Sequence, residues 1–429
     1  MDVARLDLAT ADPAAVRRVL VRSAVPDAGV RSGAADVCED VRIRGDAALR
    51  EYSDRFGGGR PGDLRVGRDE MDAALRSTPD DVVAAIDASI GAVEAAHRAQ
   101  LPEPLTVSTA EGVTIERRWS PLRRVGAYVP GGKAAYPSTL IMTVVPARVA
   151  GVPEVVVASP AAEGAAQPVL LAAAALLGVD ELYLMGGAQA VAALAHGTES
   201  IRPVQKIVGP GNQWVTAAKL AVFGACSIDL PAGPSEVLVV ADETADPTLV
   251  AVDLLCQAEH GPDSPAVLVT TDPTLPDRVA AEIDRLLPDL ARSEILGKAL
   301  SDHGLFVTAP SMEAAVEFAD AYGPEHATVV TADPEWVVDR LPAAGSVYVG
   351  EWAPESAGDY ATGANHVLPT GGLAAAEGPL SVEDFGSWRQ IQRLDRAGLA
   401  AIAPTITSLA RAEGLTAHGL AASIRLERP

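Results

Sequence analysis

The feature that most constrains the fold is an alternation of short apolar runs with longer Ala/Leu-rich stretches, which begins near residue 113. Val155–Val157 is typical of a buried strand, and a helix is expected near 168–177. Leu182–Leu184 then leads through Gly186-Gly187 into a further helix. Strands that alternate with helices across short turns form parallel sheets, because each return of the chain needs a crossover helix on the face of the sheet. The pattern therefore predicts the α/β class.

A second series of the same kind follows the first. It starts at Val237–Val240 and continues through Ala266–Thr270, Leu305–Thr308, Ala327–Val330 and Ser346–Val349, with helices between these runs. At 429 residues the chain is also too long for a single core. We therefore predict two Rossmann-like α/β lobes, each built on a parallel sheet.

The two ends of the chain depart from this alternation. The first ~100 residues have mainly helical periodicity, with one helix expected over 34–56 before Gly57–Gly59, and the tail after Leu394 is helical as well. We expect four parts: a helical N-terminal segment (1–24), a first α/β lobe (25–128 with 236–381), a second α/β lobe (129–235) and a helical C-terminal tail (382–429).

Composition excludes several classes of partner. The formal net charge of −23 argues against nucleic acid and anionic membrane surfaces, because the surplus of Lys and Arg that neutralises phosphates is missing. No apolar run approaches the ~20 residues that a membrane span needs. The three cysteines form no CxxC motif and the polar start does not resemble a secretory leader, so we expect a reduced, cytoplasmic protein.

Two glycine-rich turns follow predicted strands of the first series. Gly186-Gly187, with Gln189 in the first helical turn, can present backbone N–H groups to an anion, and Gly209–Asn212 repeats the arrangement one unit later. A tight turn without a ligand is the alternative for either one alone. Both turns should lie at one edge of one sheet, which strengthens the case for a nucleotide site over either turn taken alone. Gly131-Gly132-Lys133 is not a P-loop, since Ala134 replaces the required Ser or Thr.

Gln257 and His260 lie three residues apart at the end of an amphipathic run, on one helical face. Imidazole is the commonest metal ligand, but such a pair is more often ordinary surface. Polar, Gly- or Pro-bounded segments hold three further histidines, His326, His366 and His418, with Glu325 and Asp359 close by. Together these residues favour a metal-assisted active site.

The adjacent Glu325 and His326 offer two proton-transfer groups, although such a pair on a surface usually has no role. Cys256 can be interpreted as a nucleophile toward an aldehyde, but a buried small residue is the better interpretation.

Many motifs in this chain resemble those of the histidinol dehydrogenase family. The resemblance runs in order from about residue 30 to the C-terminus, which makes it far more specific than any one motif. It rests on Val125–Thr139, Gly186–Ala190, Val208–Asn212, Pro231–Glu236, Gln257–Ser264, Pro324–His326, Gly358–Tyr360, Asn365–Gly372 and Ala412–His418.

The resemblance implies a zinc-dependent, NAD-linked enzyme that oxidises L-histidinol through L-histidinal to L-histidine, the last step of histidine biosynthesis. It implies zinc ligands, an acid/base pair and NAD contacts at matching positions: Gln257, His260, Asp359 and His418 for zinc, Glu325 and His326 for proton transfer, and Tyr128, Gln189 and Asn212 for NAD. Substrate contacts would be Ser235, His366 and Glu413, together with Gln257, His260, His326, Asp359 and His418. The first lobe would carry the metal and acid/base residues and the second lobe the NAD contacts. The resemblance also implies a homodimer in which the C-terminal segment, with Glu413 and His418, serves the site of the other subunit.

One stretch departs from the family pattern. Leu373–Pro379 stands where the family commonly has an Arg-aromatic-Ser-Ser sequence, so oxidation of another small polar alcohol is the first alternative. A zinc hydrolase with Glu259 as general base is the second, although no HExxH motif is present and the two glycine-rich turns would have no role. A metal-binding protein without catalytic activity would leave the Glu325-His326 pair unexplained.

Overall fold

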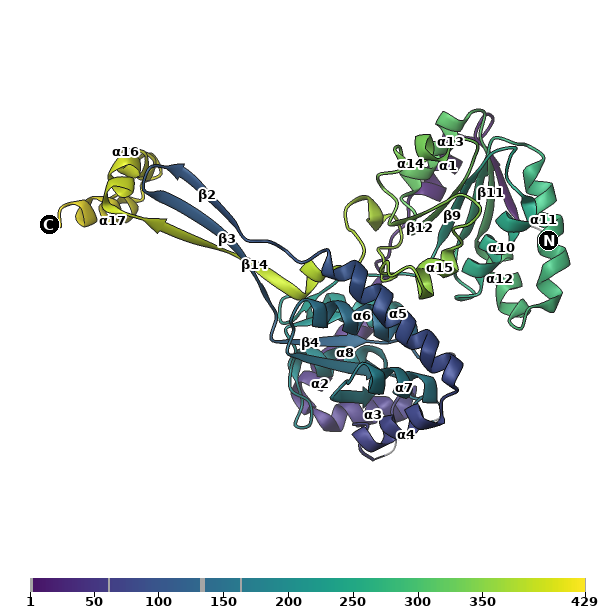
Figure 1. Cartoon of the computed structure of the whole chain (residues 1–429), viewed down its shortest axis with the longest axis horizontal. Coiled ribbons are helices and arrows are strands. Elements are labelled where there is room, and N and C mark those ends of the chain that lie inside the picture. Colours follow the sequence, from purple (N-terminus) through teal and green to yellow (C-terminus); the bar gives the residue numbers. More distant parts are fainter. Residues whose placement is uncertain (1–2, 61, 132–135, 163, 429) are drawn as a thin grey trace.

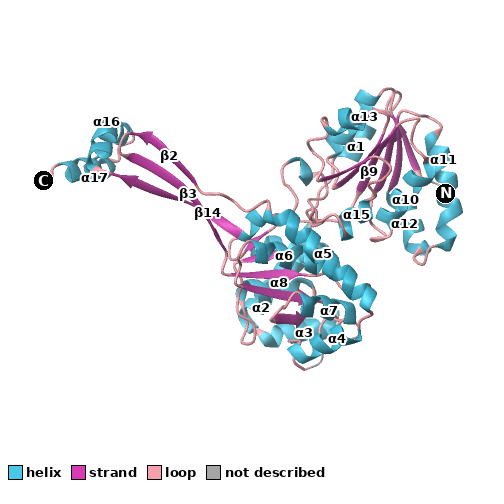
Figure 2. Ribbon diagram, viewed as in Figure 1, coloured by secondary structure: helices cyan, strands magenta, loops and turns pink. Residues whose placement is uncertain are grey.

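The computed structural model describes residues 3–60, 62–131, 136–162 and 164–428. Two α/β lobes lie side by side, and a long arm projects away from them (Figures 1 and 2). The two lobes contain the two parallel sheets, so the predicted fold class is confirmed. Gly132-Lys133-Ala134, in the sequence that we excluded as a P-loop, lies outside the described residues.

One of the two parallel sheets has five strands in the order β6-β5-β4-β7-β8. From β4 the chain adds β5 and β6 on one side of the sheet and then β7 and β8 on the other side. The strand order therefore reverses beside β4, and ligands bind at the carboxyl ends of the strands at such a switch point. The strands are β4 (Arg124–Tyr128), β5 (Glu154–Ser159), β6 (Glu181–Leu184), β7 (Lys206–Val208) and β8 (Ser227–Ile228); the helices between them are α6 (Pro137–Val149), α7 (Pro168–Leu176), α8 (Gly187–His196) and α9 (Gln213–Val222).

The second sheet has six parallel strands in the order β1-β11-β10-β9-β12-β13. Apart from the added edge strand β1, it repeats the order of the five-stranded sheet. The strands are β1 (Ala4–Asp7), β9 (Val237–Ala241), β10 (Ala266–Thr270), β11 (Gly304–Thr308), β12 (His326–Val330) and β13 (Ser346–Val349). The helices are α1 (Pro13–Leu20), α10 (Pro247–Ala258), α11 (Leu275–Leu286), α12 (Ser293–His303), α13 (Met312–Tyr322), α14 (Pro334–Val338) and α15 (Glu355–Tyr360), with short 3-10 turns at Leu287–Asp289, Leu373–Ala375 and Val382–Phe385.

The arm is an antiparallel sheet of three strands that ends in two helices (Figure 1). β3 pairs on one side with β2 and on the other with β14, so the middle of the chain and its C-terminal part are joined along the arm. The elements are β2 (Leu105–Ala110), β3 (Val113–Pro121), β14 (Gly386–Leu394), α16 (Arg396–Ala412) and α17 (Thr416–Leu426).

The structure corrects three parts of the expected domain division. Residues 25–128 were grouped with 236–381, but their helices pack on the five-stranded lobe: α2 on α8 and α9, α4 on α7, and α5 on α6. The segment 1–24 is not purely helical, because β1 forms the edge of the six-stranded sheet. The tail 382–429 likewise contains β14 before its helices. The remaining elements are α2 (Ala28–Arg44), α3 (Asp46–Phe56), α4 (Arg68–Ser77) and α5 (Asp80–Arg98).

Candidate active site

A cavity of about 820 Å³ opens at the carboxyl ends of β4 and β7, at the switch point of the five-stranded sheet. All three predicted NAD contacts, Tyr128, Gln189 and Asn212, line it. The helices α8 and α9 both begin at this cavity, at Gly187 and just after Asn212, so the positive ends of both helix dipoles can attract an anionic ligand there. The described residues therefore fit a dinucleotide phosphate group.

The walls of this cavity are held by hydrogen bonds between the predicted contacts and the helix starts. The amide of Gly187 donates to Tyr128 Oη at 3.1 Å, and burial raises the pKa of that phenol to about 12, which keeps it neutral. Asn212 Oδ1 caps α9 by accepting from the backbone amides of Trp214 and Val215.

A second cavity of about 610 Å³ adjoins the first, since Pro130, Gly211 and Asn212 line both. It lies against the amino ends of β9 and β12 in the six-stranded lobe, and seven of the predicted site residues line it. They are Asn212, Ser235, His260, Glu325, His326, Asp359 and His366, while Gln257 is buried one helical turn before His260.

Glu325 and His326 occupy the turn into β12 and are almost fully buried. Glu325 Oε2 accepts hydrogen bonds from Ser235 Oγ at 2.7 Å and from the amide of Glu236 at 2.8 Å. His326 Nδ1 lies 3.2 Å from the carbonyl oxygen of Glu236 and 3.7 Å from Glu325 Oε2. When Nδ1 donates to that carbonyl, the lone pair of Nε2 is free; this nitrogen is buried and has no hydrogen-bond partner among the described residues.

Burial shifts the pKa values of this pair in opposite senses. Loss of solvation raises the pKa of Glu325 well above its usual value and lowers the pKa of His326 to about 4. His326 is therefore neutral at pH 7 and can accept a proton at Nε2. A cation bound nearby would favour the ionised form of Glu325.

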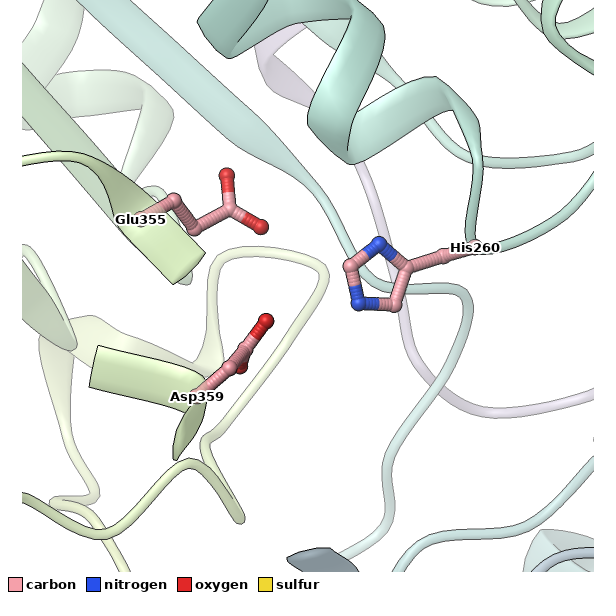
Figure 3. A group of neighbouring side chains, drawn as sticks. All are labelled: His260, Glu355 and Asp359. Carbon is pink, nitrogen blue, oxygen red and sulfur yellow. The ribbon is translucent and has the colours of Figure 1, made fainter. Parts of the chain in front are cut away.

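Three side chains of types that can bind a metal converge beside this pair. Ligand atoms of His260, Glu355 and Asp359 all lie within 4.8 Å of one another (Figure 3). Glu355 and Asp359 are four residues apart on α15, so both carboxylates project from one helical face toward His260. Glu355 was not predicted from the sequence, although its i,i+4 spacing from Asp359 was a signal that could have found it.

The buried polar atoms around this cluster fit a divalent cation. Both amide atoms of Gln257 and both carboxylate oxygens of Glu355 are buried without a hydrogen-bond partner among the described residues. Buried polar groups are rarely left unpaired, and a cation coordinated by oxygen and imidazole nitrogen would satisfy the amide oxygen of Gln257 and the carboxylate of Glu355. Asp359 Oδ1 is also 3.3 Å from His366 Nδ1, a contact that orients both side chains at the cavity.

The structure does not bring His418 and Glu413 to this site within the chain. His418 lies on α17 and Glu413 just after α16, at the tip of the arm, far from the six-stranded lobe (Figure 1). Both side chains are exposed. In the single chain the predicted zinc quartet is therefore a trio, Gln257, His260 and Asp359.

The surroundings of Cys256 and Glu259 do not suit the roles of nucleophile and general base that were considered for them. Burial raises the pKa of Cys256 to about 12, so its thiol is protonated at neutral pH and is a poor nucleophile. Glu259 is exposed and does not line the second cavity. The departing stretch Leu373–Pro379 is absent from the lining of this cavity too, and most of it is exposed.

Comparisons with known proteins agree with the motifs. The model of the family "Histidinol dehydrogenase" matches residues 20–426. A histidinol dehydrogenase of Halobacterium salinarum is 49% identical over 427 residues, which cover 98% of this chain and 99% of that protein. One from Vibrio parahaemolyticus is 45% identical over 417 residues, which cover 96% and 95%. The crystal structure of histidinol dehydrogenase from Elizabethkingia anophelis matches with a TM-score of 0.93 at 36% identity, covering 99% of this chain and 98% of that one. As the motifs predicted, the chain belongs to the histidinol dehydrogenase family.

Proposed function

We propose that this protein is a zinc-dependent enzyme that oxidises L-histidinol through L-histidinal to L-histidine with NAD, the last step of histidine biosynthesis. The observation that carries the proposal is the adjacency of two cavities in a member of this family. One has two helix N-termini at its wall, and the other contains an acid/base pair beside a set of metal-binding side chains. A dehydrogenase needs both a cofactor site and a proton acceptor beside the substrate.

Gln257, His260 and Asp359 would hold zinc, and Glu355 supplies a further carboxylate within reach. When bound, zinc would anchor the nitrogen donors of the substrate, and NAD would accept the hydride. Tyr128, Gln189 and Asn212 would place the dinucleotide, with Asn212 at the junction of the two cavities. Ser235 and His366 line the second cavity and would contact the substrate.

His326 would accept the hydroxyl proton of the alcohol at Nε2 in the first oxidation. The resulting aldehyde must add water before it can lose a second hydride, and Glu325 would take the proton of that water. Both side chains are buried at the wall of the cavity, and an aldehyde that stayed bound beside them between the two steps would have less contact with bulk solvent. The adjacency of Glu325 and His326 allows one cavity to serve both oxidations.

We further propose that the protein acts as a homodimer with shared sites. The arm carries exposed apolar side chains at Leu409, Leu415, Leu420 and Ile424, a surface that a second copy would cover. His418 and Glu413 lie on this arm, far from the candidate zinc site of their own chain (Figure 1), and would complete the site of the partner. No helix in the described part of the chain is both long and apolar enough to cross a bilayer. A cytoplasmic location is part of the proposal, and all three cysteines are free thiols.

Removal of one metal-binding side chain is expected to empty the zinc site. His260→Ala should leave zinc well below one per subunit, because an imidazole ligand is lost from a site that has few ligands. The matched control is His303→Ala, which removes an exposed histidine at the end of α12. Zinc is measured by atomic absorption on purified, dialysed protein. Full occupancy in His260→Ala would remove this residue from the zinc shell.

The proposed function is tested by NADH formation, which is followed in the near ultraviolet after addition of L-histidinol. We expect rapid NADH formation that a chelator abolishes, and much weaker activity with amino alcohols that lack the imidazole. Equal activity with those alcohols would favour the alternative of another small polar alcohol. Absence of NADH with every alcohol would contradict a dehydrogenase.

A further inference from the structure

Glu236 contacts both members of the acid/base pair through its backbone. Its amide donates to Glu325 Oε2 at 2.8 Å, and its carbonyl oxygen is 3.2 Å from His326 Nδ1. Glu236 immediately precedes β9, and His326 begins the neighbouring strand β12. The placement of Glu325 and His326 therefore depends on where the backbone of residue 236 is held.

Glu236 is 2% exposed, and its side chain is itself anchored at two points. Its carboxylate forms an ion pair with the guanidinium of Arg22 and accepts a hydrogen bond from the amide of Gly371 at 3.0 Å. Arg22 in turn donates to the carbonyl oxygen of Tyr322 and lies over the ring of that tyrosine, 3.3 Å from its centroid. The pair thus joins the segment after α1, the loop around Gly371 and the end of α13.

This arrangement has an energetic and a chemical consequence. A buried carboxylate without its cation costs free energy. The carboxylate must therefore take up a proton, or the segment that carries it must shift. A displacement of the Glu236 backbone would lengthen both hydrogen bonds to the acid/base pair, and small misplacements of reacting groups lower turnover strongly. The carbonyl oxygen of Glu236 also selects which nitrogen of His326 carries the proton, because it can only accept.

We propose that Arg22 and Glu236 are positioning residues that hold Glu325 and His326 in their working geometry and keep the proton of neutral His326 on Nδ1. The proposal rests on the proposed roles of Glu325 and His326. It makes the N-terminal segment part of the active site, although neither Arg22 nor Glu236 lines the substrate cavity. The neighbouring Ser23 and Ala24 do line it, so this segment lies at the wall.

Two variants of the full chain test the proposal by kinetics. Arg22→Met and Glu236→Gln should each lower turnover of both L-histidinol and L-histidinal about 10–100-fold, as for other residues that orient an active site from outside it. The KM for NAD and the zinc content should stay unchanged, because neither residue reaches those sites. The turnover of the double variant should be no lower than that of the less active single variant, since both changes break the same ion pair. Arg5→Met is the matched control, because Arg5 pairs with Asp277 on the surface of the same lobe.

The decisive readout is the tautomer of His326, which a role in stability alone would not change. Histidine is labelled with ¹⁵N, and the His326 signals are identified by their loss in His326→Asn. We expect the Nδ1–H form in the unmodified protein and a mixture of tautomers in both variants. Glu236→Asp, which keeps the charge but shortens the side chain, replaces either variant that fails to fold.

An unchanged tautomer, or turnover that falls only in proportion to the folded fraction, would overturn the positioning role. Failure of Glu236→Asp to fold would overturn it as well, since the pair would then act on stability. If the unmodified protein produced no NADH from L-histidinol, the proposed function would fail, while the tautomer measurement would still decide the role of the pair.

Discussion

Replacement of His326 by Asn is expected to lower the turnover of L-histidinol by a factor on the order of 10²–10⁴, the usual contribution of a general base. The expectation follows from the buried Nε2, which has no hydrogen-bond partner in the described part of the chain, and from a pKa of about 4, which keeps the imidazole neutral at pH 7. Glu325→Gln should have an effect of similar size on the overall reaction. The matched control is His97→Asn, which removes another buried histidine outside the two cavities.

The two half-reactions separate the roles of the pair. If Glu325 activates the water that attacks the aldehyde, Glu325→Gln should impair oxidation of L-histidinal more than that of L-histidinol, and His326→Asn should slow the alcohol step most. Stopped-flow measurement of NADH with each substrate gives the two rates. Equal damage to both steps in both variants would contradict this division of roles.

Mixing two inactive variants is expected to restore activity if the active site is shared between subunits. His260→Ala removes a ligand at the cavity, and His418→Ala removes one on the arm, which lies far from that cavity in the same chain (Figure 1). In a heterodimer with exchanged arms, one site lacks both ligands and the other is intact. Random exchange of equal amounts should therefore restore about a quarter of the unmodified activity, because half of the dimers are mixed.

The same mixture distinguishes whether His418 completes the active site of its own chain or that of the partner. If His418 served its own chain, each site of the heterodimer would lack one ligand and the mixture would stay inactive. Heterodimers are detected by native mass spectrometry, with one variant carrying an affinity tag. Inactivity of proven heterodimers would contradict the shared site and leave the zinc ligands of the cavity in place.

The strand–helix alternation was enough to predict both lobes, because strand and helix periodicities are local properties of the chain. It did not show where the N-terminal helices pack. The apolar face of a helix indicates that it is covered, but not by which sheet, so residues 25–128 were grouped with the wrong lobe. The expected helix over 34–56 is two helices separated at Gly45, where φ is 55°, and the carboxylate of Glu199 lies so close that an added Cβ there would meet it. Glu199 is distant in sequence, so no local pattern reports this contact.

In the active site too, local sequence patterns predicted some features but missed those that depend on contacts between distant residues. The glycine-rich turns predicted a ligand at the carboxyl edge of the five-stranded sheet, and a cavity lies there. The acid/base pair instead lies at the amino ends of β9 and β12, where that rule gives no guidance. The Arg22–Glu236 pair was missed because its importance comes from burial and from partners far away along the chain, whereas Glu355 had a local signal in its i,i+4 spacing from Asp359.

The stoichiometry of NADH formation tests the central claim most directly. The protein is incubated with zinc, excess NAD and a limiting amount of L-histidinol until absorbance in the near ultraviolet stops rising, and the product is identified by mass spectrometry. Two successive oxidations in one cavity predict two NADH per L-histidinol and L-histidine as the product. One NADH per molecule with L-histidinal released, or no NADH at all, would contradict the account.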